Sequence, residues 1–71
     1  MKFWIIQHTH RFGNSCWPVF TDQEPDVVWL LENDKDFADD WEGEDPRDDT
    51  KDFRDDEYIE VFGPFFPPQN V

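Results

Sequence analysis

The sequence has little of what usually reinforces a small domain. Cys16 is the only cysteine among 71 residues, which excludes an intramolecular disulfide and the CxxC frameworks that hold structural metals. A chain of this length buries only about 60% of its unfolded surface, so its hydrophobic core is marginal. A single cysteine is also consistent with a reducing compartment, and the sequence therefore predicts a cytoplasmic location.

Positive charge and long apolar runs are scarce as well. Six Lys and Arg residues stand against eighteen Asp and Glu residues, which gives a formal net charge of −12. Nucleic acids and anionic membranes would repel such a chain, because phosphate binding depends on Lys and Arg. The apolar run at residues 3–6 is far shorter than a signal-peptide core or a membrane span. These features predict no direct contact with nucleic acid or membrane.

Aromatic residues are abundant instead. Eight Phe, four Trp and one Tyr make up 18% of the chain, and each ring can bury about 150–250 Å². A high net charge with a mean hydropathy of −0.89 would otherwise be typical of a disordered chain. We therefore expect residues 1–71 to form a single small domain, with an acidic insertion at residues 34–57.

The pattern of apolar residues predicts three strands. Residues 2–10 carry apolar side chains on both faces, which is typical of a central strand. The residues from Phe12 to Ser15 favour a turn, and residues 16–21 resume a strand in which Pro18 requires an edge position or a bulge. Residues 58–62 predict a third strand that ends at Gly63. The tail at residues 65–68 is predicted to be irregular, and its two Phe residues would either cover the core or dock a partner.

One short helix is predicted between the second and third strands. Thr21 and Glu24 have the spacing of a capping box, and Pro25 suits a first helical turn, so that the helix would cover residues 25–32. The resulting fold class is a small α+β domain: a β-hairpin, one helix on one face, an acidic excursion and a C-terminal strand in a three-stranded antiparallel sheet. The predicted core comprises Trp4 or Phe3, Ile5, Ile6, Val19, Phe20, Val28, Leu31, Ile59 and Val61.

The acidic insertion is the most unusual part of the sequence. Residues 34–57 hold thirteen of the eighteen carboxylates, and two carboxylates about 6 Å apart in water repel each other by roughly 0.7 kcal/mol. The insertion also contains two similar hexapeptides, residues 35–40 (KDFADD) and residues 51–56 (KDFRDD). We interpret them as two similar acidic turns, in which Phe37 or Phe53 is the buried anchor and the paired aspartates face water.

Tests for site chemistry leave one weak alternative. His8 and His10 lie on one face of a strand and could share a divalent ion if a carboxylate or Cys16 completed the site. The EF-hand registers that begin at Asp34 and Asp48 lack the required Gly and Glu. A Cys16 nucleophile beside either histidine lacks an orienting group, and no nucleophile elbow, Walker loop or dinucleotide fingerprint is present. The sequence therefore predicts no enzymatic activity and no cofactor.

The remaining interpretation is charge mimicry. In charge density and size the chain resembles the acidic inhibitors that phages and mobile elements direct against restriction, repair or CRISPR enzymes. That resemblance implies a basic, nucleic-acid-binding protein as partner and leaves a homodimer possible. The alternatives are a small bacterial α+β domain with a solvated acidic loop, a halophile-like surface, or a weak metal-binding protein. The predicted partner-binding residues are Asp36, Asp39, Asp40, Trp41, Glu42, Glu44, Asp45, Asp48, Asp49, Asp52, Asp55 and Asp56.

Overall fold

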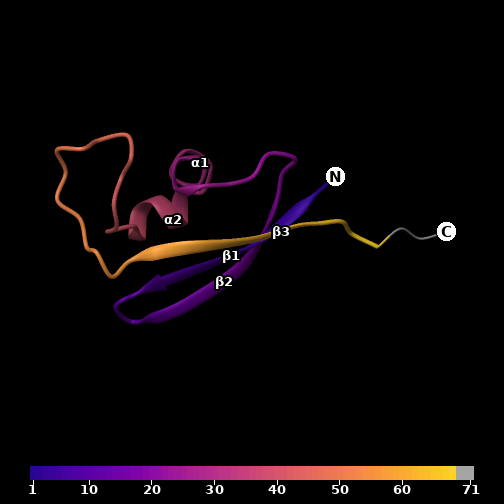
Figure 1. Ribbon diagram of the computed structural model, residues 1–71, viewed down its shortest axis with the longest axis horizontal. Coiled ribbons are helices and arrows are strands. Elements are labelled where there is room, and N and C mark those ends of the chain that lie inside the picture. The colour runs from indigo at the N-terminus through magenta and orange to yellow at the C-terminus, as the bar shows by residue number, and fades with distance from the viewer. Residues whose placement is uncertain (69–71) are drawn as a thin grey trace.

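The computed structural model describes residues 1–68, which form a three-stranded antiparallel sheet with two short helices on one face (Figure 1). The elements are β1 (Phe3–His10), β2 (Gly13–Phe20), α1 (Val27–Asn33), α2 (Lys35–Asp40) and β3 (Tyr58–Phe65). This arrangement confirms the predicted small α+β fold. Within residues 1–68, no helix is long and apolar enough to cross a membrane.

The central strand of the sheet is β1, because the strand order is β2-β1-β3. Its alternate residues Trp4, Ile6 and His8 are buried on the helix side, as the apolar pattern predicts. The hairpin turn lies at Arg11 and Phe12, earlier than predicted, because His10 already pairs with Gly13. Gly13 has a φ of +133°, a conformation that glycine adopts without steric cost. β2 is an edge strand, as its proline requires.

The third strand is longer than predicted. It continues past Gly63, so the prediction that the strand ends there and that Phe65 is irregular is wrong. The register of β3 against β1 shifts between Phe3 and Ile5, and this irregularity lets Phe65 pair with Phe3 after the Gly-Pro step. Gly63 has a φ of +137°, and a Cβ there would lie 3.0 Å from the indole of Trp4. Glycine therefore permits the close approach that extends the sheet.

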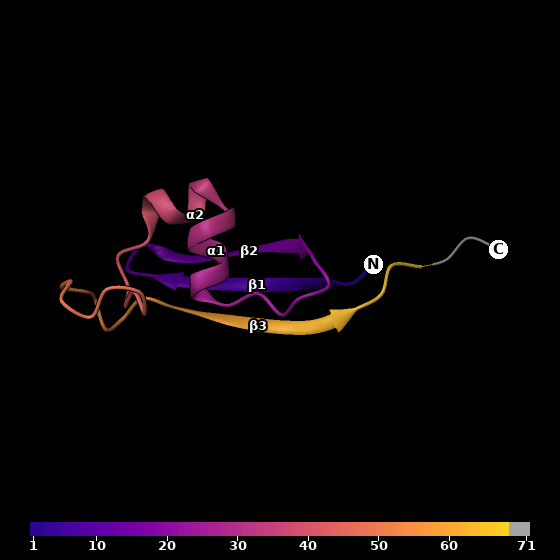
Figure 2. The same ribbon diagram turned by 90° about the horizontal axis from the view of Figure 1, so that it is seen from above.

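Helix α1 begins later than predicted. Asp26 is its N-cap, and the Asp26 carboxylate accepts a hydrogen bond from the Trp29 backbone N–H at 2.8 Å. The predicted capping box is wrong, because the Thr21 hydroxyl accepts a hydrogen bond from the backbone N–H of Gln23 in a turn before the helix. Figure 2 shows α1 and α2 over the sheet, with β2, β1 and β3 running side by side beneath them.

The hydrophobic core lies between the helices and the sheet. Leu30 and Ile6 are fully buried, and Leu31, Ile59 and Val61 pack around the core as partly buried residues. Phe20 was predicted to be in the core, but it is 58% exposed because it lies on the face of the sheet that carries no helix. Three further predicted core residues, Phe3, Ile5 and Val28, are only half-buried. The buried core comprises Trp4, Ile6, Val19, Leu30, Phe37 and Trp41.

Candidate partner-binding surface

The first acidic hexapeptide forms helix α2 and not a turn. Asp34 caps it, since its carboxylate accepts a hydrogen bond from the Phe37 backbone N–H at 3.1 Å. The backbone N–H of Asp34 also donates to the carbonyl of Leu30 at 2.8 Å, so the same residue ends α1. Phe37 is only 4% exposed and stacks on Trp41 at a ring-centroid distance of 5.0 Å. The predicted role of Phe37 as a buried anchor is confirmed.

Trp41 belongs to the core and not to a partner-binding surface. It is buried, and its indole N–H donates to the carbonyl of Glu44 at 3.1 Å. Gly43 packs so tightly against the indole that a Cβ at this position would collide with the ring. Trp41 is predicted to contact a partner, but its ring is covered by the chain itself, so we leave it out of the proposed partner-binding surface.

The second acidic hexapeptide is irregular. Residues 51–56 contain no helix, and Phe53 is 47% exposed. The prediction of two similar turns, each with a buried Phe anchor, is therefore wrong for this copy. Its last three residues are held locally, since Arg54 binds the Asp56 carboxylate through Nε at 3.0 Å and Nη2 at 2.9 Å. This pairing lowers the pKa of Asp56 below its ordinary value.

A buried carboxylate ties the acidic loop to the sheet. Glu57 accepts a hydrogen bond from His8 Nε2 at 3.1 Å and another from the backbone N–H of Glu42. The backbone N–H of Arg54 donates to the carbonyl of Glu42 at 2.8 Å, which closes the neck of the same loop. Glu57 was not singled out by sequence reasoning. Its position directly before a predicted strand and after both hexapeptides already distinguished it from the other carboxylates of the insertion.

The structure gives no support to the weak alternative of a metal site on the two histidines. His8 is buried and bound to Glu57, while His10 Nδ1 accepts a hydrogen bond from the backbone N–H of Phe12 at 3.2 Å. Cys16 pairs with Gln7 on the opposite face of the sheet, so it cannot complete a site with the histidines. In the part of the chain that the structure describes, no group of three or more His, Cys, Asp or Glu side chains is placed to hold a metal ion.

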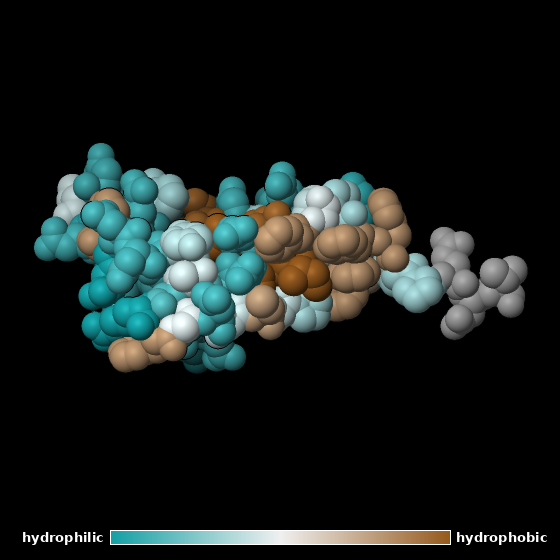
Figure 3. Space-filling model, turned by 60° about the horizontal axis from the view of Figure 1, so that its bottom comes forward, coloured by the Kyte–Doolittle hydropathy of each residue, from teal (hydrophilic) through white to brown (hydrophobic). Residues whose placement is uncertain are grey.

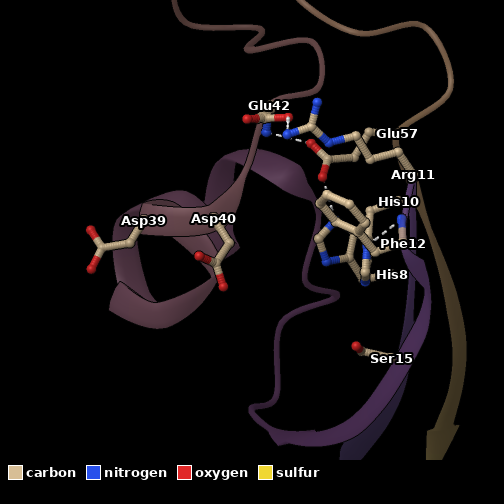
Figure 4. Close-up of a pocket in the computed structure, with 9 residues that line it drawn as sticks. All are labelled: His8, His10, Arg11, Phe12, Ser15, Asp39, Asp40, Glu42 and Glu57. Carbon is tan, nitrogen blue, oxygen red and sulfur yellow. Dashed lines mark hydrogen bonds and ion pairs between the residues drawn. The ribbon is translucent and has the colours of Figure 1, made fainter.

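A hollow of about 370 Å³ lies beside the histidines (Figure 4). Ser15, His8 and Glu57 line it and are the residue types of a hydrolytic triad. Such a triad requires the hydroxyl within hydrogen-bond reach of the imidazole, whereas Figure 4 shows the Ser15 hydroxyl set apart from His8. Asp39 and Asp40 lie across the hollow on α2. The hollow is therefore a depression lined by carboxylates, and its buried histidine, His8, is hydrogen-bonded to Glu57.

Asp45, like Trp41, is a predicted partner-binding residue that is buried in the structure. It is 9% exposed, and Arg47 binds it through the backbone N–H at 2.9 Å, Nε at 3.1 Å and Nη2 at 3.2 Å. These hydrogen bonds from Arg47 hold the pKa of Asp45 below its ordinary value. Hydrogen bonds from the side chain and backbone of Thr50 likewise lower the pKa of Asp48. Asp48 is nevertheless exposed.

The other predicted carboxylates are all exposed and make up what we call the acidic end. Figure 1 shows the loop after α2 at one extremity of the molecule and the end of β3 toward the other, and Figure 3 shows hydrophilic side chains gathered at the loop extremity. Within residues 1–68, only Glu42 and Asp56 of this set have an ion-pair partner. The acidic end comprises Asp36, Asp39, Asp40, Glu42, Glu44, Asp48, Asp49, Asp52, Asp55 and Asp56.

Comparison with known proteins adds no functional assignment. No protein-family model, no curated protein and no solved structure matches the chain. The charges, contacts and exposed surfaces of the molecule are therefore the basis for inferring its function.

Proposed function

We propose that the protein is a non-enzymatic binding protein whose acidic end occupies a basic, nucleic-acid-binding surface of a partner protein and blocks it. The observation that carries this proposal is the position of the charges. Ten exposed carboxylates gather at the acidic end, whereas the 47 residues outside the insertion carry five. Carboxylates that served only for solubility would be just as effective if they were spread over the whole surface.

The density of these charges is comparable to that of a duplex. B-DNA carries one negative charge per 1.7 Å of helix axis, or about 14 charges over 24 Å. The molecule measures 50 × 24 × 17 Å, and residues 34–57 carry thirteen carboxylates and four cations, so their net charge of −9 is of the same order. A cleft lined with Lys and Arg for nucleic acid would therefore attract this end, and phages and mobile elements use inhibitors of this kind against restriction or CRISPR enzymes.

The fold holds the acidic end in place against its own repulsion. Asp34 caps α2, Trp41 and Phe37 anchor it in the core, and Glu57 closes the loop against His8. A preformed charged surface avoids the cost of ordering a flexible segment during binding. Complementary charge also speeds association, up to 10⁸ M⁻¹s⁻¹ or more at low salt, and makes binding weaken as ionic strength rises.

A capture experiment tests the proposal. The protein is immobilised and exposed to a bacterial lysate at about 50 mM and about 300 mM NaCl. These concentrations lie below and above physiological ionic strength, at which the Debye length is about 8 Å. Retained proteins are then eluted with duplex DNA or RNA. We expect basic nucleic-acid-binding proteins to be retained at low salt and to be released by nucleic acid. Retention of no basic protein, or of proteins that nucleic acid does not release, would make the acidic end a solvated loop.

Activity assays complete the test. Each captured enzyme should lose its binding to labelled DNA or RNA when the purified protein is added in stoichiometric amounts. Capture without loss of nucleic-acid binding would show an acidic docking protein that leaves the active surface of its partner open, which would contradict the blocking function.

A further inference from the structure

The face of the sheet that carries no helix is apolar over half of its length. Side chains alternate along β1, so that Phe3 and Ile5 point away from the helices. Their partners in the register are Phe20 and Pro18 on β2 and Phe65 and Phe62 on β3. We call this set the aromatic face; it comprises Phe3, Ile5, Pro18, Phe20, Phe62 and Phe65.

Three rings form a row across all three strands of the aromatic face. Phe3 lies between Phe20 and Phe65, with ring centroids 5.4 Å and 5.5 Å away. Phe20 is 58% exposed, Phe62 is 44% exposed and Phe65 is 42% exposed. Figure 3, which brings the helix-free side of the sheet forward, shows hydrophobic side chains gathered on the half of the molecule away from its hydrophilic extremity.

The other half of the same sheet face has the composition expected of a solvated surface. There the register places Gln7 beside Cys16 and Glu60, and Thr9 beside Asn14 and Tyr58. An antiparallel sheet commonly exposes one face when that face is polar. The aromatic face departs from this pattern within the same three strands, and a contiguous apolar area of this kind is typical of an interaction site.

The aromatic face is large enough to form an interface. Phe20, Phe62 and Phe65, together with the 69% exposed Phe66 that follows the last strand, expose about 430 Å² if each ring offers about 200 Å². Phe3, Ile5 and Pro18 add to this area. A specific interface buries at least about 1,000 Å² in total, or about 500 Å² from each partner. The aromatic face together with the adjacent Phe66 reaches that size without any contribution from the acidic end.

We propose that a second copy of this chain covers the aromatic face, and that the protein is a homodimer in which two sheets stack face to face. A two-fold interface uses the same area on both copies and therefore needs only a self-complementary surface. The six residues of the aromatic face carry no charge, so the contact opposes no like charges directly. Pairing of two such faces removes the exposed rings of both copies from water at once.

The segregation of charge makes this dimer compatible with a formal net charge of −12 per chain. The molecule is 50 Å long, and the acidic end and the aromatic face lie toward opposite extremities (Figure 3). If the two copies run in opposite directions, their acidic ends point away from each other and are separated by far more than the Debye length of about 8 Å at physiological salt. The repulsion between the copies is therefore screened.

Sedimentation equilibrium on three proteins tests the dimer. The chain has a mass of 8.6 kDa, and the wild type should sediment at twice that mass at micromolar concentrations. Phe20→Asp places a charge in the aromatic face on an edge strand and should weaken the dimer at least tenfold. Tyr58→Asp is the matched control, because Tyr58 is 48% exposed on the same sheet face but outside the aromatic face. We expect this control to dimerise like the wild type.

Three results would contradict the proposed dimer. A wild type that stays at 8.6 kDa up to millimolar concentration, or a Phe20→Asp variant that dimerises as tightly as the control, would show that no second copy covers the aromatic face. An isotope-filtered NOE experiment on mixed labelled and unlabelled wild type needs no substitution. It should show intermolecular contacts from the rings of Phe3, Phe20 and Phe65, and intermolecular contacts confined to other rings would also overturn it. Neither experiment depends on the function of the acidic end.

Discussion

The two acidic hexapeptides differ at one position and adopt different structures. KDFADD forms helix α2 with Phe37 4% exposed, whereas KDFRDD is irregular with Phe53 47% exposed. Their flanks explain the difference. The residue before each copy is Asp34 in one case and Thr50 in the other, and the residue after each copy is Trp41 or Glu57. The five residues that the two hexapeptides share therefore do not decide their structure.

The i+4 neighbour of the phenylalanine decides which copy is buried. Trp41 stacks on Phe37 at 5.0 Å, and both rings pack beside His8 on the sheet. The equivalent neighbour of Phe53 is Glu57, whose carboxylate binds His8 instead. The first copy, through Phe37, thus contributes to the core, whereas Glu57, which follows the second copy, closes the loop against the same histidine.

The largest expected effect comes from removing the two phenylalanines separately. Phe37→Ala should lower the free energy of unfolding by about 3–5 kcal/mol, because it leaves a cavity in a small core. A domain with a total stability of about 5 kcal/mol would then be partly unfolded at room temperature. Phe53→Ala should cost less than about 1 kcal/mol. Urea unfolding monitored by tryptophan fluorescence compares the two, and equal losses would contradict the difference between the copies.

Removal of the loop closure should have an intermediate effect. Glu57→Ala leaves His8 and the backbone N–H of Glu42 without their buried acceptor, which should cost about 1–3 kcal/mol. Glu60→Ala is the control, because it removes an exposed carboxylate from β3, the strand that follows Glu57, and should change stability by no more than about 0.5 kcal/mol. The two variants are compared by thermal unfolding, and a loss no greater than that of the control would mean that the loop is not held by Glu57.

The caps of the two copies should differ by a smaller amount. Asp34→Ala removes the hydrogen bond to the Phe37 backbone N–H and should cost about 1 kcal/mol together with some far-UV helix signal. The Thr50 hydroxyl donates to Asp48 at 2.6 Å in an exposed turn and caps no helix. Thr50→Ala should therefore leave the helix signal unchanged. Loss of helix signal in this control would mean that the second copy is helical in solution.

The smallest expected effect concerns the pH dependence of the loop. Hydrogen bonds from Arg47 lower the pKa of Asp45 in the folded state, so this pair stabilises the fold above the ordinary pKa of 3.8 and the stabilisation is lost as pH falls through the lowered value. Arg47→Ala should raise the pKa of Asp45 toward its ordinary value and leave that of Asp56 low. NMR titration of the side-chain carboxyl carbons measures both, and an unchanged Asp45 pKa would contradict the pairing.

Much of the sheet could be predicted from the sequence, because strand signals are local. Apolar side chains on both faces of residues 2–10 indicated the central strand, and Pro18 indicated the edge strand. The extension to Phe65 could not be predicted, because it depends on the bulge opposite Phe3 and on the close contact between Gly63 and Trp4. Such features follow from packing between segments that are far apart in the sequence.

The sequence identified the segment that carries the candidate site but did not show which of its residues are buried. Ten of the twelve predicted partner-binding residues are exposed at one extremity, because dense charge resists burial. Trp41 and Asp45 could not be separated from them by sequence, since their burial depends on Phe37 and on Arg47. Helix α2 was missed for a related reason. Six residues carry too weak a helical signal by themselves, and their stability comes from tertiary contacts.

The position of the acidic charges, and not their number, is the central claim about function, and two charge-matched quartets test it. Asp39→Asn, Asp40→Asn, Asp49→Asn and Asp55→Asn neutralise four exposed carboxylates of the acidic end. The control quartet, Asp22→Asn, Glu24→Gln, Glu32→Gln and Glu60→Gln, neutralises four exposed carboxylates outside the insertion. Both variants keep the capping and loop-closing carboxylates Asp26, Asp34 and Glu57.

The direct measurement is the affinity of each quartet for a captured nucleic-acid-binding partner at low salt, with circular dichroism as the check of folding. We predict that the quartet at the acidic end binds at least tenfold more weakly than the wild type, while the control quartet binds within about twofold, because complementary charge acts over short distances in salt solution. Equal weakening of both quartets, or no weakening of either, would contradict a function carried by the acidic end.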